Sequence, residues 1–459
     1  MTNDTIAALA TPPGSGGIGI IRVSGSQARP IVSRLFGTTR KGPDPDRTLE
    51  SHRLIHGYIF DAASGTPIDE VMVVAMHAPR SYTAEDVVEI QAHAGSMVMG
   101  TLLDQVIRSG ARIADPGEFT KRAFLNGRID LTQAEAVMDI INARSAISLK
   151  LAASQSLGSL GDAIAGTRRQ LIDFLALIEA AIDFPDDAQE FVPQDQGLRA
   201  ITQALETCRS FLRHYTDAHF LRDGIKLAIC GATNVGKSSL MNRLIARERS
   251  IVTAQPGTTR DLIEESITIQ GIPFLITDTA GMRPTDDLVE KIGIEKAKKN
   301  IRESDLVLYM KEAGSTVTQA EISAIIPPDK KVILVINKTD LISGNEPETI
   351  PQALDHIPVV RISALKDQGI DTLRKQITDM AVGSMDTFST VVPNLRHKLA
   401  LEQAADHLET ARAGFSQTPE PETLAIDIRS AAELLGQITG DTAGIDILDT
   451  IFSKFCIGK

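Results

Sequence analysis

Short apolar runs near the amino terminus are the first pattern in the chain. The runs Thr5–Leu9, Ile18–Val23, Val71–Ala75 and Val87–Ile90 have the length and the aliphatic character of β-strands. Segments compatible with helices alternate with these runs. Residues 1–120 are therefore predicted to form an α+β domain.

A helical periodicity takes over after this region. Residues 121–222 contain few glycines or prolines and repeat their apolar positions with helical spacing, as in Leu131–Ile141. The same spacing returns in residues 384–459, which end in a Cys-Ile-Gly-Lys tail, whereas residues 223–383 contain buried-strand runs. We therefore expect an all-α domain in two parts that pack around one core, interrupted by an inserted domain.

The inserted domain opens with a phosphate-binding loop in a strand-to-helix setting. Gly231–Ser238 follows the apolar run Lys226–Cys230 and precedes the amphipathic segment Ser239–Ile245. Glycines let backbone N–H groups close around a triphosphate, Lys237 supplies a positive charge to the outer phosphates, and the Ser238 hydroxyl can ligate Mg²⁺. This pattern predicts a Ras-like P-loop domain, so the predicted fold class of the whole chain is multidomain α/β.

Further motifs follow in the order that a GTPase requires. The apolar strand Leu275–Asp278 ends at an aspartate suited to the Mg²⁺ shell, and Gly281 is placed to sense the γ-phosphate. Asp340 can accept hydrogen bonds from the N1–H and the 2-amino group of guanine, whereas adenine would leave this carboxylate unpaired. Ser363–Leu365 fits the loop whose N–H groups contact the guanine oxygen. The set favours GTP, and an ATPase or a chance phosphate loop is the weaker alternative.

A switch segment lies between the first two motifs. It spans Thr253–Asp261, and Thr259 within it can reach Mg²⁺ when the γ-phosphate is present. The residue that follows Asp-Thr-Ala-Gly is Met282, where GTPases of the Ras kind place a glutamine that orients the attacking water. A thioether cannot orient water. The chain is therefore either a poor hydrolase or carries a different catalytic group.

Composition excludes several other classes of protein. Lys and Arg number 47 against 59 Asp and Glu, a net charge of −12, so the surface as a whole does not attract nucleic acid, although a local basic patch would. No apolar run is long enough for a membrane span and the first residues form no signal peptide, which predicts a cytoplasmic protein. Cys208, Cys230 and Cys456 are too few and too far apart to indicate a disulfide framework or a zinc site.

Gly14–Gly19 matches the glycine pattern of dinucleotide-binding proteins. In those proteins the pattern opens a helix, whereas here it precedes a strand. We interpret it as a backbone loop near a ligand or partner, with a plain surface turn as the equal alternative.

Motifs at both ends of the chain, combined with the inserted GTPase, are similar to those of one family. The stretches are Asp4–Gly14, Ser81–Glu89, Pro116–Asn126 and Phe455–Lys459. With them, essentially the whole chain resembles the MnmE family of tRNA modification GTPases, also called TrmE.

The resemblance implies an activity and a set of partners. The family uses GTP hydrolysis, together with the FAD-dependent flavoprotein MnmG (GidA), to place an aminomethyl or carboxymethylaminomethyl group on C5 of the wobble uridine of certain tRNAs. A tetrahydrofolate such as 5-formyltetrahydrofolate binds the N-terminal domain, which also forms the homodimer, and the dimer joins the flavoprotein in a heterotetramer. The FAD belongs to the partner. Potassium activates hydrolysis in place of an arginine finger.

The resemblance also implies roles for single residues. Glu290 would orient the attacking water and so replace the missing glutamine, with Lys237 as the second catalytic residue. The implied Mg²⁺ ligands are Ser238 and Thr259, and the implied K⁺ ligands are Asn234, Thr253, Gln255 and Thr258, hard oxygen donors with Gln255 acting through its backbone carbonyl. The expected GTP-binding residues are Asn234, Val235, Gly236, Lys237, Ser238, Ser239, Thr253, Ala254, Gln255, Pro256, Gly257, Thr258, Thr259, Asp278, Thr279, Ala280, Gly281, Asn337, Lys338, Asp340, Ser363, Ala364 and Leu365.

The folate site implied by the resemblance consists of Arg22, Glu89, Arg128 and Lys459. A carboxylate suits the pterin amine, and cations suit the carboxylates of the glutamyl tail. Arg128 stands where the family commonly has lysine, so the charge is kept while the hydrogen-bond geometry changes.

Two other functions are compatible with parts of the sequence. One is a GTP-dependent ribosome-assembly or signalling switch without modification chemistry, but such a protein would need an appended RNA-binding module, and neither an RRM nor a KH signature is visible. The other is a folate-dependent one-carbon enzyme with a regulatory GTPase, which would form product without the flavoprotein.

Replacement of Glu290 by alanine tests the catalytic group that stands in for glutamine. We expect the hydrolysis rate of Glu290→Ala to fall by about 10²- to 10⁴-fold, the range for loss of a positioned acid or base, while GTP affinity stays nearly unchanged. The rate is measured by phosphate release at saturating GTP. A variant that hydrolyses at the parent rate would contradict this catalytic role. It would favour the alternative that Glu290 forms a solvent-exposed acidic surface with Asp286 and Asp287.

Overall fold

The computed structural model describes most of the chain, namely residues 4–14, 16–184, 194–246, 264–278, 298–342, 354, 356–382, 391–417 and 421–459. These residues fall into two compact units. The first comprises Met1–Met138, Gln155–Arg209 and Leu399–Lys459, and the second comprises Asp139–Ser154 and Ser210–Lys398. The second unit contains the nucleotide motifs, and the first unit encloses it in sequence.

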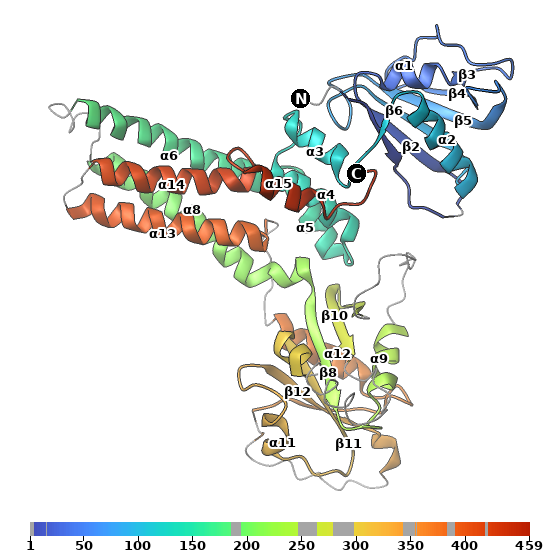
Figure 1. The fold of residues 1–459 in the computed structure, drawn as a ribbon. Coiled ribbons are helices and arrows are strands. Elements are labelled where there is room, and N and C mark those ends of the chain that lie inside the picture. Colours follow the sequence, from blue (N-terminus) through green and yellow to red (C-terminus); the bar gives the residue numbers. More distant parts are fainter. Residues whose placement is uncertain are drawn as a thin grey trace, which may run out of the picture. The chain divides into compact units, whose positions relative to one another are not determined.

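The first unit begins with a seven-stranded sheet in the order β3-β4-β5-β6-β2-β1-β7 (Figure 1). Neighbouring strands are antiparallel except for β1 and β7, which are parallel. Three helices accompany this sheet. The bounds are β1 Ile6–Leu9, β2 Gly19–Ser24, α1 Ala28–Ser33, β3 Phe36–Gly37, β4 Leu54–Phe60, β5 Pro67–Met76, β6 Val87–Ala92, α2 Ser96–Arg108, β7 Arg112–Ile113 and α3 Glu118–Leu125.

The two faces of this sheet have different chemistry. Ile21 and Val23 of β2 and Ile90 of β6 join the apolar core that contains residues of α1 and α2. Because side chains alternate along a strand, Arg22 and Glu89 lie on the opposite face, where β2 and β6 pair them directly. A polar site is therefore possible on that face without disturbing the core.

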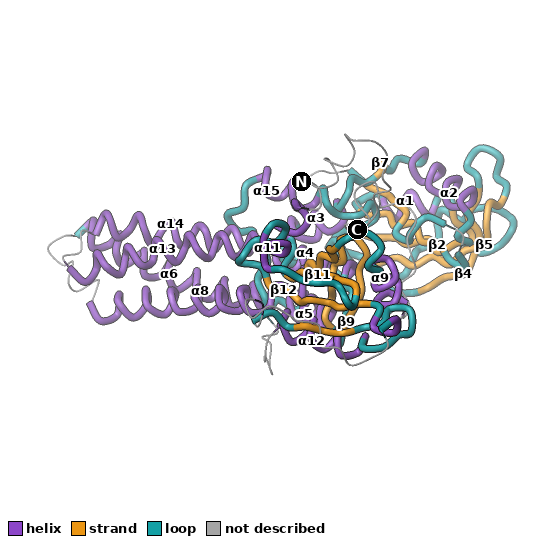
Figure 2. Tube along the Cα trace, turned by 90° about the horizontal axis from the view of Figure 1, so that it is seen from below, coloured by secondary structure: helices purple, strands orange, loops and turns teal. Residues whose placement is uncertain are grey.

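Long helices from distant parts of the sequence form the rest of the first unit. Figure 1 and Figure 2 show α6 lying beside α14. Phe174 of α6 and Phe415 of α13 meet edge to face, with ring centroids 6.2 Å apart. A Cβ on Gly197 of α8 would lie 2.5 Å from the Phe415 ring, so glycine lets this third helix approach both rings closely. The helices that lie wholly in the first unit are α6 Ser159–Asp183, α14 Pro421–Thr439 and α15 Ile445–Phe452. The helices α4 Leu131–Asn142, α8 Gln194–Asp223 and α13 Leu395–Gln417 are divided between the two units, and most of α5 Ala146–Ser156 belongs to the second.

The second unit is built on a six-stranded sheet in the order β13-β12-β11-β8-β10-β9. All neighbouring strands are parallel except for the hairpin of β9 and β10. The carboxyl ends of the parallel strands therefore meet at one edge, where such sheets bind ligands. The bounds are β8 Ile225–Gly231, α9 Lys237–Ala246, β9 Glu264–Ile269, β10 Ile272–Asp278, β11 Leu306–Glu312, α11 Gln319–Ser323, β12 Lys331–Asn337, η2 Thr339–Leu341, β13 Val359–Arg361 and α12 Ile370–Val382.

The central strands β8, β11 and β12 of this sheet are buried on both faces. In β8, Leu227 and Ile229 belong to one apolar cluster, whereas Ala228 and Cys230 belong to another. A strand buried on both sides needs apolar residues at every position, which explains the unbroken apolar runs in the sequence.

The predicted fold class, a multidomain α/β protein with α+β, all-α and P-loop parts, is confirmed. The strands β3, β4, β7, β9 and β11 were not predicted. In β4, His56 and Gly57 interrupt the apolar run. No helix in the described part of the chain is both long and apolar enough to cross a membrane.

Candidate functional site

The phosphate loop joins β8 to α9 through backbone angles that few residues adopt. Asn234 has a φ of 63° and Gly236 a φ of 96°, and alternation of this kind forms an anion-binding concavity of N–H groups. The helix α9 begins at Lys237, so its N-terminus adds further N–H donors. The Lys237 Nζ donates to the carbonyls of Gly231 and Ala232, at 3.0 and 2.7 Å. The loop is thus shaped for phosphate, with its lysine held over it.

A buried amide fastens the loop after β12 to the phosphate loop. Asn337 is 2% exposed, and its Nδ2 donates to the carbonyl of Val235 at 2.7 Å. Its Oδ1 accepts the N–H of Ala364 at 3.0 Å. A Cβ on Gly236 would lie 2.2 Å from the Asn337 Nδ2, so only glycine permits this contact. One side chain therefore joins the phosphate loop, the β12 end and the loop after β13.

The proposed guanine-selective carboxylate is held in its ionised form. The Ser363 hydroxyl donates to Asp340 Oδ1 at 2.7 Å, and Lys366 Nζ lies 3.9 Å from Oδ2. The hydrogen bond from Ser363 holds the pKa of the Asp340 carboxyl below its ordinary value. An ionised carboxylate accepts from both guanine donors, which is the role expected from the sequence.

Other expected nucleotide residues lie at the same edge of the sheet. Ser238 and Ser239 are exposed in the first turn of α9. The β10 strand ends at Asp278, which pairs in register with Ile229 of β8, the strand that leads into the phosphate loop. Lys338 has a φ of 63° and pairs with a glutamate of β11 at 3.0 Å. Thr253–Thr259, Thr279–Gly281 and Glu290 lie outside the described residues.

The expected folate residues meet on the polar face of the N-terminal sheet. Arg22 Nε donates to Glu89 Oε1 at 2.8 Å, and the two side chains are 15% and 17% exposed. Arg22 Nη1 donates to the carbonyl of Gly458 at 3.3 Å. Gly458 has a φ of 94°, and a Cβ there would lie 2.2 Å from the carbonyl oxygen of Leu9. The tail that ends at Lys459 therefore lies against the end of β1, beside Arg22.

Tyr82 organises the cations of this site. The guanidinium carbons of Arg22 and Arg128 each lie 5.1 Å from the centroid of its ring. Its hydroxyl shares a hydrogen bond of 2.9 Å with Thr120 of α3, and Arg128 also donates to its backbone carbonyl. The role of Tyr82 could not be predicted from the sequence, because an aromatic residue in a loop gives no sign of which cations it contacts.

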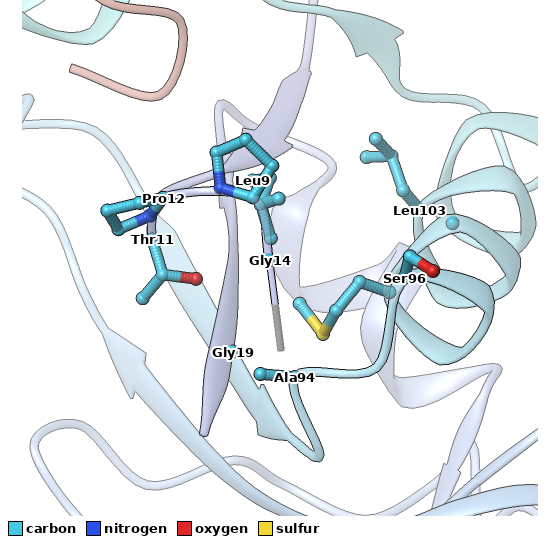
Figure 3. A pocket seen from close by; sticks show the side chains of 11 residues that line it. Leu9, Thr11, Pro12, Gly14, Gly19, Ala94, Ser96 and Leu103 are labelled. Carbon is cyan, nitrogen blue, oxygen red and sulfur yellow. The ribbon is translucent and has the colours of Figure 1, made fainter. Parts of the chain in front are cut away.

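A cavity of about 200 Å³ lies against the other face of the same sheet (Figure 3). Leu9, Gly14, Gly19 and Met99 are among the residues that line it. A Cβ on Gly19 would lie 2.6 Å from the Met99 sulfur, so this cavity is on the α2 face, opposite to Arg22. The glycine-rich loop that resembled a dinucleotide fingerprint thus borders an apolar cavity through Gly14.

The cysteines do not form disulfides in the structure. Burial raises the pKa of the Cys208 and Cys230 thiols to about 12, so neither is a nucleophile at neutral pH. Cys456 is exposed, and its backbone carbonyl accepts the N–H of Gly117 at 3.4 Å.

A phosphate loop followed by an ionised carboxylate at the carboxyl edge of a parallel sheet is the arrangement of a P-loop GTPase. Models of two domain families together match almost the whole chain. The MnmE helical domain matches residues 131–456, and the GTP-binding protein TrmE N-terminus matches residues 5–128. The chain belongs to the MnmE family of tRNA modification GTPases.

Curated relatives agree over the full length. The chain is 43% identical to the tRNA modification GTPase MnmE of Moorella thermoacetica, covering 100% of both chains. It is 42% identical to the protein of the same name from Streptococcus pneumoniae serotype 2 (strain D39 / NCTC 7466), covering 99% of both. Among solved structures, Aquifex aeolicus Era Y63A bound to GDP.AlF4- matches with 29% identity and a TM-score of 0.29, covering 40% of this chain and 66% of that one. The full-length relatives make the protein a GTP hydrolase of tRNA modification that uses GTP and Mg²⁺.

Replacement of Asp340 by asparagine tests the base contact. We expect Asp340→Asn to shift the preference from GTP toward xanthosine triphosphate, because an amide donates to the 2-oxo group where guanine presents an amine. Competition binding of the two triphosphates measures the shift. Undiminished selectivity for GTP would contradict the role of this carboxylate.

Proposed function

We propose that this chain is a potassium-activated GTPase that acts with an FAD-dependent MnmG/GidA flavoprotein on tRNA. In this proposal the pair places a carboxymethylaminomethyl or aminomethyl group on C5 of the wobble uridine, with a carbon unit from a tetrahydrofolate. The FAD resides on the partner, and the two proteins form a heterotetramer in the cytoplasm. The proposed domains are residues 1–120, 121–222, 223–383 and 384–459.

The convergence of Arg22, Glu89, Arg128 and the tail around Tyr82 is the observation that carries the folate part of the proposal. Positions separated by most of the chain supply a carboxylate and cations on one sheet face. A reduced pterin has amine donors for Glu89, and its glutamyl tail has carboxylates for the two arginines and Lys459. The residues present therefore fit a tetrahydrofolate, which would supply the carbon unit when bound.

The metal ions fit the residues of the phosphate loop. The exposed Ser238 hydroxyl offers a hard oxygen ligand for Mg²⁺, with Thr259 as the second ligand in this proposal. The ion would neutralise charge on the β- and γ-phosphates when bound. Asn234 is exposed in the same loop and offers an oxygen for K⁺. The loop N–H groups hold the phosphates, Lys237 balances their charge, and Glu290 orients the water in this proposal.

The polar face of the N-terminal sheet also supports the proposed homodimer. Along β5, Val71, Val73 and Ala75 are buried in the core, whereas Met72 and Val74 between them are only half-buried. Leu54 on the neighbouring strand is 48% exposed. A second copy would cover these apolar side chains, which stabilises association.

The first prediction from this proposal concerns the activating ion. We expect GTP hydrolysis to be faster in K⁺ than in Na⁺, because the proposed oxygen ligands, from Asn234 and the switch segment, would suit the larger ion. Asn234→Ala should remove most of this difference with little loss of nucleotide binding, since the phosphates are held by backbone N–H groups. Phosphate release in matched chloride salts measures it, and equal parent rates in both salts would overturn the potassium assignment.

The second prediction concerns the modification itself. The full chain, its flavoprotein partner, unmodified tRNA, GTP and 5-formyltetrahydrofolate are combined, and the nucleosides are identified by mass spectrometry. We expect the modified uridine only when both proteins are present, and expect Arg22→Ala to lower its yield at least about tenfold, because loss of a partner leaves Glu89 unpaired.

Arg40→Ala is the matched control, because Arg40 stacks on Tyr58 at 5.4 Å outside the proposed site. It should modify tRNA like the parent. Product formed without the flavoprotein would favour a self-sufficient one-carbon enzyme, and absence of product from the complete mixture would contradict the proposal.

A further inference from the structure

An arginine on the helix after the phosphate loop holds the loop that faces the guanine base. Arg243 is on α9, and its Nε donates to the carbonyl of Ala364 at 2.9 Å. Its Nη2 donates to the carbonyl of Leu365 at 2.8 Å. A planar guanidinium bonded to two consecutive carbonyls fixes both peptide planes at once.

Several backbone N–H groups of the same loop donate hydrogen bonds to acceptors within the protein. Ser363 N–H donates to the Gln368 carbonyl, Ala364 N–H to Asn337 Oδ1, and Lys366 N–H to the Ser363 hydroxyl. Within the described part of the chain, no acceptor is recorded for the N–H of Leu365, whose side chain is 75% exposed as well. This donor is therefore available to a ligand.

Arg243 controls the direction of that available donor. The carbonyl of Ala364 and the N–H of Leu365 belong to one rigid peptide unit and point in opposite directions. The bond from Arg243 Nε to this carbonyl therefore sets where the N–H points, and polarisation of the carbonyl strengthens the N–H as a donor. On the proposed binding mode, the acceptor in reach is the 6-oxo group of guanine.

We propose that Arg243 is a positioning residue for guanine specificity. By orienting the peptide between Ala364 and Leu365, it lets the protein distinguish purines by the group at C6. Asp340 reads the 2-amino side of the base independently. The inference rests on the proposed guanine-binding roles of Asp340 and Ser363–Leu365. It assigns a specificity role to a side chain that does not touch the nucleotide.

The test compares three nucleoside diphosphates by isothermal titration calorimetry on the full chain with Mg²⁺. GDP carries both recognised groups, 6-thio-GDP replaces only the C6 oxygen by sulfur, a weaker acceptor, and IDP lacks only the 2-amino group. We expect the parent protein to bind GDP more tightly than either analogue. In Arg243→Gln the ratio of 6-thio-GDP to GDP dissociation constants should fall by about 3- to 10-fold, the effect of losing one positioned hydrogen bond, while the ratio for IDP stays unchanged.

Companion variants separate a specificity role from general damage. Arg243→Lys keeps the charge but can hold only one carbonyl well, so it should lie between the parent and Arg243→Gln. Arg34→Gln is the matched control, because Arg34 also donates to two backbone carbonyls, of Pro30 and Ser109, at 3.1 and 3.3 Å in the first unit. Its two ratios should equal those of the parent.

Each result decides between the possible readings. An Arg243→Gln protein that weakens GDP and 6-thio-GDP equally, or that leaves both affinities unchanged, would overturn the inference. A parent protein that discriminates neither analogue would instead remove the proposed guanine contacts on which the inference stands. In Asp340→Asn, the protein should no longer distinguish IDP from GDP but should still distinguish 6-thio-GDP from GDP. This result would support recognition of the two edges of the base by separate groups.

Discussion

The hydrogen bonds of one buried amide hold the nucleotide site together. Asn337 forms hydrogen bonds with the Val235 carbonyl of the phosphate loop and with the Ala364 N–H of the loop after β13. An apolar residue at this position would leave two backbone groups unsatisfied, and each costs about 1–3 kcal/mol when buried. The amide also restricts position 236 to glycine, which in turn permits the left-handed turn before Lys237. The spacing between the phosphate loop and the loop after β13 is thus fixed by one buried side chain.

A comparable arrangement holds the polar face of the N-terminal sheet. The helix α3 fastens the loop that contains Tyr82: Thr120 bonds the tyrosine hydroxyl, and the Asn126 amide donates to the carbonyl of Thr83 at 2.7 Å. Arg122, buried in the same helix, pairs with Glu85 at the end of that loop. The N-terminal end of α3 meets the carboxyl-terminal tail through Gly117. One short helix therefore aligns the ring that orients the arginines with the tail that lies beside them.

The sequence predicted the chemistry that is local in the chain and missed the chemistry that is made by folding. The setting of the phosphate loop between a strand and a helix was predicted because its strand, glycines and lysine are adjacent in the sequence. Arg22 and Gly458, however, are 436 positions apart, so only the family resemblance brought the tail and this arginine together before the structure did. The role of Arg243 could not be predicted at all, because an arginine on an amphipathic helix is usually a solvated side chain.

The second unit extends beyond the P-loop domain and includes residues Asp139–Ser154. Leu151 of α5 is buried in the same cluster as Ile267 and Ile269 of β9, and Thr268 donates to the carbonyl of Arg144 at 3.0 Å. The hairpin fastened in this way ends, on its other strand, at Asp278. A β-strand pair transmits displacement along its length because its ladder of hydrogen bonds resists shear.

The helix α4 also makes contacts near both of its ends. Its last turn contains Asp139, which pairs with Arg222 of α8 at 2.6 Å, immediately before the strand that leads to the phosphate loop. Its first turns contain Leu131 and Ala134, which pack in one cluster with Phe452 and Phe455, next to the tail. The two ends of α4 are therefore held by different parts of the chain, the first turns by the carboxyl-terminal segment and the last turn by α8.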